Sequence, residues 1–207
     1  MPEYTMLTLQ GDPFTMGQQH GQQVLHLRPQ IAEAVAARFR QLDEDGPDPR
    51  FEALVQDTRT LLEEIDAPLL AMIRGQAQAL AFEFDVLLRY NLIAFLRDDL
   101  LVRRIDALAT EGCTTWAASG SATVGGEPVL AKNRDYRADH LPLQTVVSAT
   151  PGSGYPYLYV SSAGSPGVFS AGMNQAGLAV ADTHVYSTDL GPGLPSYALM
   201  MHVLEGH

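Results

Sequence analysis

The sequence predicts an α+β protein in which a mainly helical region precedes a strand-rich region. From about residue 28 to 107, apolar residues recur at helical spacing. After Cys113 the chain changes to short runs rich in threonine, valine, tyrosine and serine, separated by glycine and proline. We therefore expect a helical leader over residues 1–112 and a second region over residues 113–207.

Four helices are expected in the first region. Apolar stripes run over residues 31–42 and 51–65, and residues 46–49 (GPDP) separate them because proline cannot continue a helix. Residues 66–80 begin with Asp-Ala-Pro, which has the form of an N-cap and a first helical turn. A fourth helix is expected from residue 85 to about residue 104.

Short strands separated by turns are expected in the second region. Turn residues stand at 125–126 (GG), 151–154 (PGSG) and 165–167 (SPG). The runs around them predict strands near residues 114–121, 128–134, 143–150, 156–161, 167–171 and 177–184. A last helix begins near Pro195 and continues through Leu204 without a stop signal, so we expect the fold to be incomplete at the C-terminus.

Composition argues against some classes of partner. The formal net charge is −11, whereas nucleic-acid binding depends on lysine and arginine neutralising phosphates. The N-terminus lacks the basic and apolar segments of a secretory signal, and no apolar run reaches the roughly 18 residues of a membrane span. We expect a cytoplasmic protein that binds neither nucleic acid nor membrane.

Cys113 is the only cysteine. It therefore forms no internal disulfide, and a cysteine-based zinc site is not expected. His140, His184 and His202 show no metal-binding spacing, so no metal or cofactor is predicted, and His20 is expected to be structural. A lone cysteine is either an inert buried residue or a nucleophile, and its surroundings decide between the two.

A predicted hairpin brings polar residues back to Cys113. If the chain folds back at residues 125–126, the segment from Lys132 to Asp135 returns to the neighbourhood of residues 114–118. Strand alternation places Asn133 and Asp135 on one face and Lys132 on the other, so these three serve one site only if the regular pleat ends there.

Four segments together resemble a known family. They are residues 11–21 (GDPFTMGQQHG), 112–115 (GCTT), 132–136 (KNRDY) and 172–178 (GMNQAGL). In this order they resemble the acyl-coenzyme A:6-aminopenicillanic acid acyltransferase family of self-processing N-terminal-nucleophile (Ntn) hydrolases, and more distantly penicillin V acylase and bile salt hydrolase. The resemblance implies an αββα sandwich for the region after residue 112.

The resemblance also implies roles for individual residues. Cys113 would be the nucleophile, freed by self-cleavage of the Gly112–Cys113 bond, and Asp135 would hold its new amine. Lys132 stands where bile-salt relatives have arginine, which is not an equivalent donor. Asn174 falls where relatives use a backbone N–H in the oxyanion hole. The supporting residues would be Thr114, Thr115 and Asn133.

Cleavage would give Cys113 a base of its own. A free α-amino group has a pKa of about 7.7–8.0 and a thiol a pKa of about 8.5, so proton exchange between them is nearly balanced near neutral pH. The expected protein is a zymogen that becomes an amidase or acyltransferase acting through a thioester on a small-molecule amide or acyl donor. Its two fragments are expected to stay associated.

Two other functions remain open from the sequence. The chain is alternatively an unprocessed or inactive remnant whose helical half binds a partner. The second alternative is a conventional cysteine hydrolase with a histidine base. This function requires His140 or His184 to lie beside Cys113.

Overall fold

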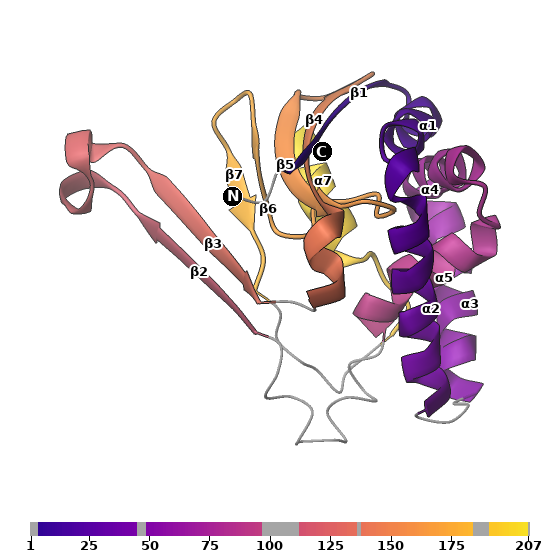
Figure 1. Cartoon of the computed structure of the whole chain (residues 1–207). Helices are drawn as coiled ribbons and strands as arrows, with labels where there is room; N and C mark the ends of the chain where they lie inside the picture. Colours follow the sequence, from indigo (N-terminus) through magenta and orange to yellow (C-terminus); the bar gives the residue numbers. More distant parts are fainter. Residues whose placement is uncertain (1–3, 45–48, 97–111, 136–137, 184–190, 207) are drawn as a thin grey trace.

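A computed structural model describes residues 4–44, 49–96, 112–135, 138–183 and 191–206. The fold is mixed α and β, as the sequence predicts, with a helical region followed by strands. Helices α1–α5 gather on one side of a five-stranded sheet, and a separate two-stranded hairpin projects from the other side (Figure 1). In the described part of the chain, none of the helices combines the length and apolar character needed to cross a bilayer.

The predicted helices are present, and one more precedes them. The described helices are α1 (Pro13–Gln23), α2 (Arg28–Glu44), α3 (Pro49–Ile65), α4 (Ala67–Leu80), α5 (Phe84–Leu96) and α7 (Ser196–Glu205). Asp66 caps α4 as expected, because its Oδ1 accepts a hydrogen bond from the Leu69 N–H at 3.1 Å. The expected continuation of the fourth helix past residue 96 lies outside the described residues.

The main sheet has the order β1-β4-β5-β6-β7. Its strands are β1 (Thr5–Gly11), β4 (Gln144–Pro151), β5 (Tyr157–Ser162), β6 (Ala171–Asn174) and β7 (Ala179–Ala181). β1 pairs in parallel with β4, and the other neighbours are antiparallel. β1 and α1 are not predicted from the sequence, and the strand predicted over residues 167–171 is wrong, because β6 begins only at Ala171.

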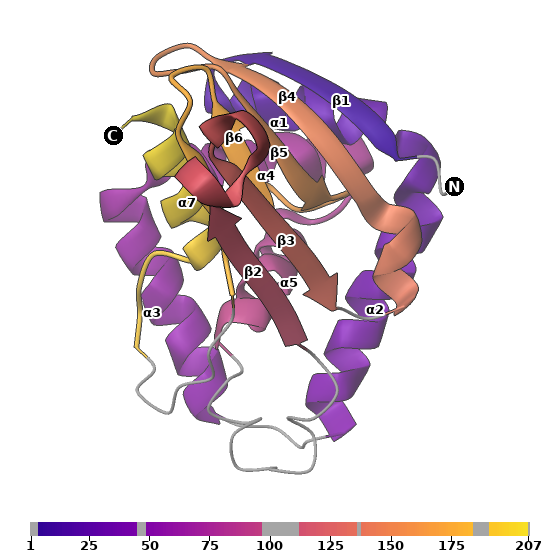
Figure 2. The same ribbon diagram turned by 90° about the vertical axis from the view of Figure 1, so that its left-hand side faces the viewer.

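The second sheet is the predicted hairpin, formed by β2 (Gly112–Ala118) and β3 (Val129–Asp135). Two short 3₁₀ turns, Gly120–Ala122 and Val124–Gly126, make its tip. Gly125 and Gly126 have φ of 80° and 78°, a backbone conformation that glycine adopts readily. In Figure 2 the hairpin lies in front of the main sheet.

The core fills the space between the helices and the sheet. Leu7 and Leu9 alternate inward from β1, and α4 is buried along most of its length. α1 and α4 cross so closely that a Cβ added at Gly17 would overlap the Met72 carbonyl, and one added at Gly75 would overlap the Phe14 carbonyl. This packing fixes β1, and through it β4, against the helical layer.

Candidate active site

The register of the hairpin determines which candidate residues share a face. The cross-strand pairs are Gly112↔Asp135, Cys113↔Arg134, Thr114↔Asn133 and Thr115↔Lys132. Partners directly opposite each other project to the same face of the sheet. The regular pleat continues through Asp135, and it places Asn133 and Asp135 on one face and Lys132 on the other, as predicted.

The two faces of the hairpin differ in how far their side chains are buried. The face with Cys113, Thr115, Lys132 and Arg134 is half-buried. The opposite face, with Thr114, Asn133 and Asp135, is exposed to solvent. Cys113 therefore shares its environment with two cationic side chains, and the Asp135 side chain projects away from the thiol.

The backbone of Asp135, and not its side chain, lies near Cys113. Because Gly112 pairs with Asp135 and Cys113 pairs with Arg134, the Gly112–Cys113 peptide unit lies opposite the Arg134–Asp135 peptide unit. Cα atoms of such partners are about 4.5–5.5 Å apart. An amine at Cys113 would thus stand at the end of the hairpin, beside the last residues of β3.

Lys132 is the centre of a contact between the hairpin and the main sheet. Its side chain is only 3% exposed, its Nζ lies 3.1 Å from Asp182 Oδ1, and it also donates to the Asp182 carbonyl. The Thr115 hydroxyl donates to the same carbonyl at 3.1 Å and accepts from the Thr183 hydroxyl at 2.8 Å. Asp182 and Thr183 are not among the site residues predicted from the sequence.

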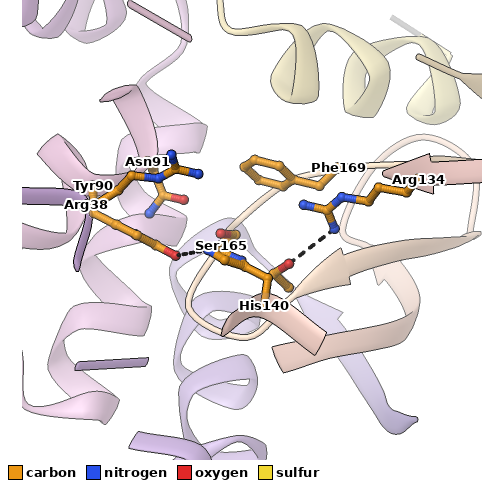
Figure 3. A pocket seen from close by; sticks show the side chains of 8 residues that line it. Arg38, Tyr90, Asn91, Arg134, His140, Ser165 and Phe169 are labelled. Carbon is orange, nitrogen blue, oxygen red and sulfur yellow. Dashed lines mark hydrogen bonds between the residues drawn. The ribbon is translucent and has the colours of Figure 1, made fainter. Parts of the chain in front are cut away.

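Arg134 reaches a narrow pocket between the hairpin, the main sheet and the helices. The pocket has a volume of about 10 Å³, room for one water-sized group. Its lining residues are Arg38, Tyr90, Asn91, Arg134, His140, Ser162, Ser165 and Phe169. In Figure 3, Arg134 enters from the side opposite Arg38 and Tyr90. Its Nη1 lies 3.4 Å from the Ser162 hydroxyl oxygen.

His140 lines this pocket and is 6% exposed. Its Nε2 lies 3.4 Å from the Tyr90 hydroxyl, and the two rings are stacked. Cys113 is not among the described residues that line the pocket, so the arrangement gives a thiol–imidazole pair no support. His184, the other histidine considered as a base, lies outside the described residues.

Asn174 is placed away from Cys113. Its side chain is buried, donates to the Leu204 carbonyl at 2.9 Å and accepts from the Leu178 N–H at 3.0 Å. Its backbone N–H donates to the Leu178 carbonyl. Asn174 lies at one end of β6, and the other end of this strand, which is nearest Asp182, is about 10 Å away. In this structure Asn174 fastens the β6–β7 turn to α7.

His20 has the structural surroundings expected for it. The imidazole is fully buried, and its Nε2 accepts a hydrogen bond from the Gly164 N–H at 3.2 Å. Burial lowers the pKa of His20 to about 4, so the ring is neutral at physiological pH. It links α1 to the loop after β5.

Comparison with known proteins gives one family. Residues 122–207 match the family model of acyl-coenzyme A:6-aminopenicillanic acid acyl-transferase, which confirms the family resemblance over that part of the chain. The match includes Lys132, Asp135 and Asn174 and begins after Cys113. No curated protein matches the chain. The relationship indicates acyltransferase or hydrolase chemistry of the Ntn type.

Proposed function

We propose, from the relationship of residues 122–207 to the acyl-coenzyme A:6-aminopenicillanic acid acyl-transferases, that this chain is a self-processing cysteine amidohydrolase or acyltransferase. Cys113 would be its nucleophile and Gly112–Cys113 the bond that is cut. The observation that carries the proposal is the position of Cys113 at the start of β2, half-buried and on the same face as Lys132 and Arg134.

Self-processing would begin with attack by the Cys113 sulfur on the Gly112 carbonyl carbon. The peptide C–N bond breaks as the nitrogen takes up a proton, which leaves a thioester and a free α-amino group on Cys113. Water then hydrolyses the thioester to a Gly112 carboxylate and a free thiol. Glycine at position 112 favours this step, because it has no side chain to obstruct the attack.

The freed amine would then serve as the base for turnover. It takes the thiol proton, the thiolate attacks an amide carbonyl, and the departing amine leaves with a proton as the acyl group becomes a thioester. Water as acceptor makes the reaction a hydrolysis, and an amine as acceptor makes it an acyl transfer.

The roles predicted for Asp135 and Asn174 require contacts that differ from those described above. Asp135 would hold the amine from the end of β3, which is adjacent to it in the register, after a rotation of its exposed side chain. Asn174 would contribute an oxyanion donor only if its N–H released the Leu178 carbonyl and also came within hydrogen-bond distance of an acyl group on Cys113. A lost oxyanion donor reduces turnover by about 2.7–4 kcal/mol of transition-state stabilisation.

Intact-mass analysis of the purified chain under denaturing conditions tests the proposal. We expect fragments of residues 1–112 and 113–207 from the wild-type chain, a single uncut chain from Cys113→Ala, and slower cutting in Cys113→Ser. Val129→Thr, an exposed change elsewhere on the hairpin, is the control and should be cut normally. Cutting at Gly112–Cys113 in Cys113→Ala would overturn the mechanism. A wild-type chain that stays intact would favour a binding module.

A further inference from the structure

A cavity of about 370 Å³ lies at the end of the main sheet that is remote from Cys113. It is enclosed by the starts of α1 and α4, by α7 and by the turn after β4. β5 connects this end, where Tyr157 contacts Glu205, to the other end, where Ser162 contacts Arg134. Five residues of extended strand span roughly 16 Å, so the cavity is separate from the hairpin site.

The wall of the cavity is mostly apolar and adaptable. Three methionines, Met16, Met72 and Met201, line it together with Leu69. Unbranched thioether side chains adjust to ligands of irregular shape. The volume falls within the range of small-molecule sites, which are mainly apolar with a few positioned polar groups.

The polar groups of the cavity are predominantly acidic. Asp66 is 3% exposed, caps α4 and accepts a hydrogen bond from His202 Nε2 at 3.0 Å. Asp12 caps α1, and Glu205 accepts from the Tyr157 hydroxyl at 2.9 Å. No lysine or arginine is among the described residues that line the cavity.

The residues that line the cavity therefore include three with carboxylate side chains and one with an imidazole. Hydrogen bonds from Thr15 lower the pKa of Asp12, which keeps this carboxylate ionised at neutral pH. The two helix N-termini offset part of the negative charge, each with about half an elementary charge. With three acidic residues and no lysine or arginine among the described lining residues, the cavity favours a cation over an anion of the same shape.

We propose that this cavity binds a small molecule with an apolar body and a protonated amine. The apolar body would pack against the methionines, and the ammonium group would lie at the acidic side formed by Asp12 and Glu205. The site does not involve Cys113, so it is independent of the proposed reaction.

The test uses the full chain with Cys113→Ala, so that no covalent reaction intervenes, and methionines labelled with ¹³C in their methyl groups. The probes are hexylamine, 1-hexanol and hexanoate, which share an apolar chain and differ in the head group. We expect saturable shifts at Met16, Met72 and Met201, with exposed Met6 and Met173 as unaffected references. Hexylamine should bind about tenfold more tightly than hexanoate.

Two variants test the charge preference. Glu205→Gln and Asp12→Asn keep a hydrogen-bond acceptor while removing a charge, and each should weaken hexylamine binding by about three- to tenfold without changing hexanol binding. Glu33→Gln, an exposed carboxylate elsewhere, should leave both unchanged. The proposal is overturned if no probe shifts the three cavity methionines, if hexanoate binds as tightly as hexylamine, or if hexylamine binds both cavity variants as tightly as the parent.

Discussion

The Lys132 ammonium group lies 3.1 Å from the Asp182 carboxylate, and this ion pair joins the hairpin that carries Cys113 to the end of the main sheet. The Lys132 side chain is almost fully buried, whereas that of Asp182 is 31% exposed. The Thr115 hydroxyl reinforces the contact at the Asp182 carbonyl. Since β2 and β3 form a sheet of their own, such side-chain contacts help to hold the hairpin in place.

Lys132→Met should destabilise the protein by about 1–3 kcal/mol, because it leaves the partly buried Asp182 carboxylate without its cation. Lys132→Arg, which keeps the charge, should have a smaller effect. Urea unfolding followed by circular dichroism measures both. Arg40→Met, which breaks the exposed Arg40–Glu33 pair, is the control and should change stability by less than about 0.5 kcal/mol. Equal losses in Lys132→Met and Arg40→Met would contradict the structural importance of the buried pair.

His20 should make stability depend on pH. Its pKa is about 4 in the folded protein against 6.5 for the ordinary side chain, so below pH 6.5 the unfolded state binds more protons. Its contribution is fully present above pH 6.5 and is lost progressively as the pH falls toward 4. Between pH 7 and pH 5 the loss should be about 2 kcal/mol. Urea unfolding at both values should show a smaller loss in His20→Gln, and an identical loss would refute the assignment.

Gly17→Ala should force α1 and α4 apart, because the added methyl group would meet the Met72 carbonyl. Overpacking of this kind destabilises by about 1–3 kcal/mol. Thermal unfolding compares it with Gly191→Ala, where nothing lies within 4 Å of the added carbon. An equal melting temperature for the two variants would mean that the helices do not cross this closely.

Asn174→Ala should lower stability by about 2–3 kcal/mol, since the Leu204 carbonyl and the Leu178 N–H lose their side-chain partner. The backbone N–H is retained, so turnover per folded molecule should be unchanged if the side chain is only structural. Thermal unfolding and an activity assay corrected for folded protein measure the two effects. A fall in corrected turnover would instead implicate the amide side chain in the reaction.

The sequence predicts most helices well because their signals are local. The Asp66 cap and the apolar stripes of α2 and α3 depend on neighbours within one or two turns. β1 and α1 also carry local signals in the sequence. Leu7 and Leu9 alternate with polar residues, and Asp12-Pro13 is a cap followed by a first helical residue. The partner of β1 is β4, more than 130 residues later, so no local pattern reveals the pairing.

The candidate site is predicted in part. The hairpin and the division of its faces follow from the turn at Gly125–Gly126 and from strand alternation. The contacts of Lys132 with Asp182 and of Arg134 with Ser162 join strands that are not neighbours in sequence. Residue spacing carries no information on such contacts, which depend on how the two sheets are oriented. The burial of Asn174 against α7 escapes prediction for the same reason.

The parallel ladder between β1 and β4 has a consequence for any cut at Gly112–Cys113. All seven residues of β1 are paired with β4, and α1 packs beside them, so both sides of such a nick contribute strands to one sheet. Severing the chain there would leave a single particle, and gel filtration in native buffer would not distinguish it from the intact polypeptide.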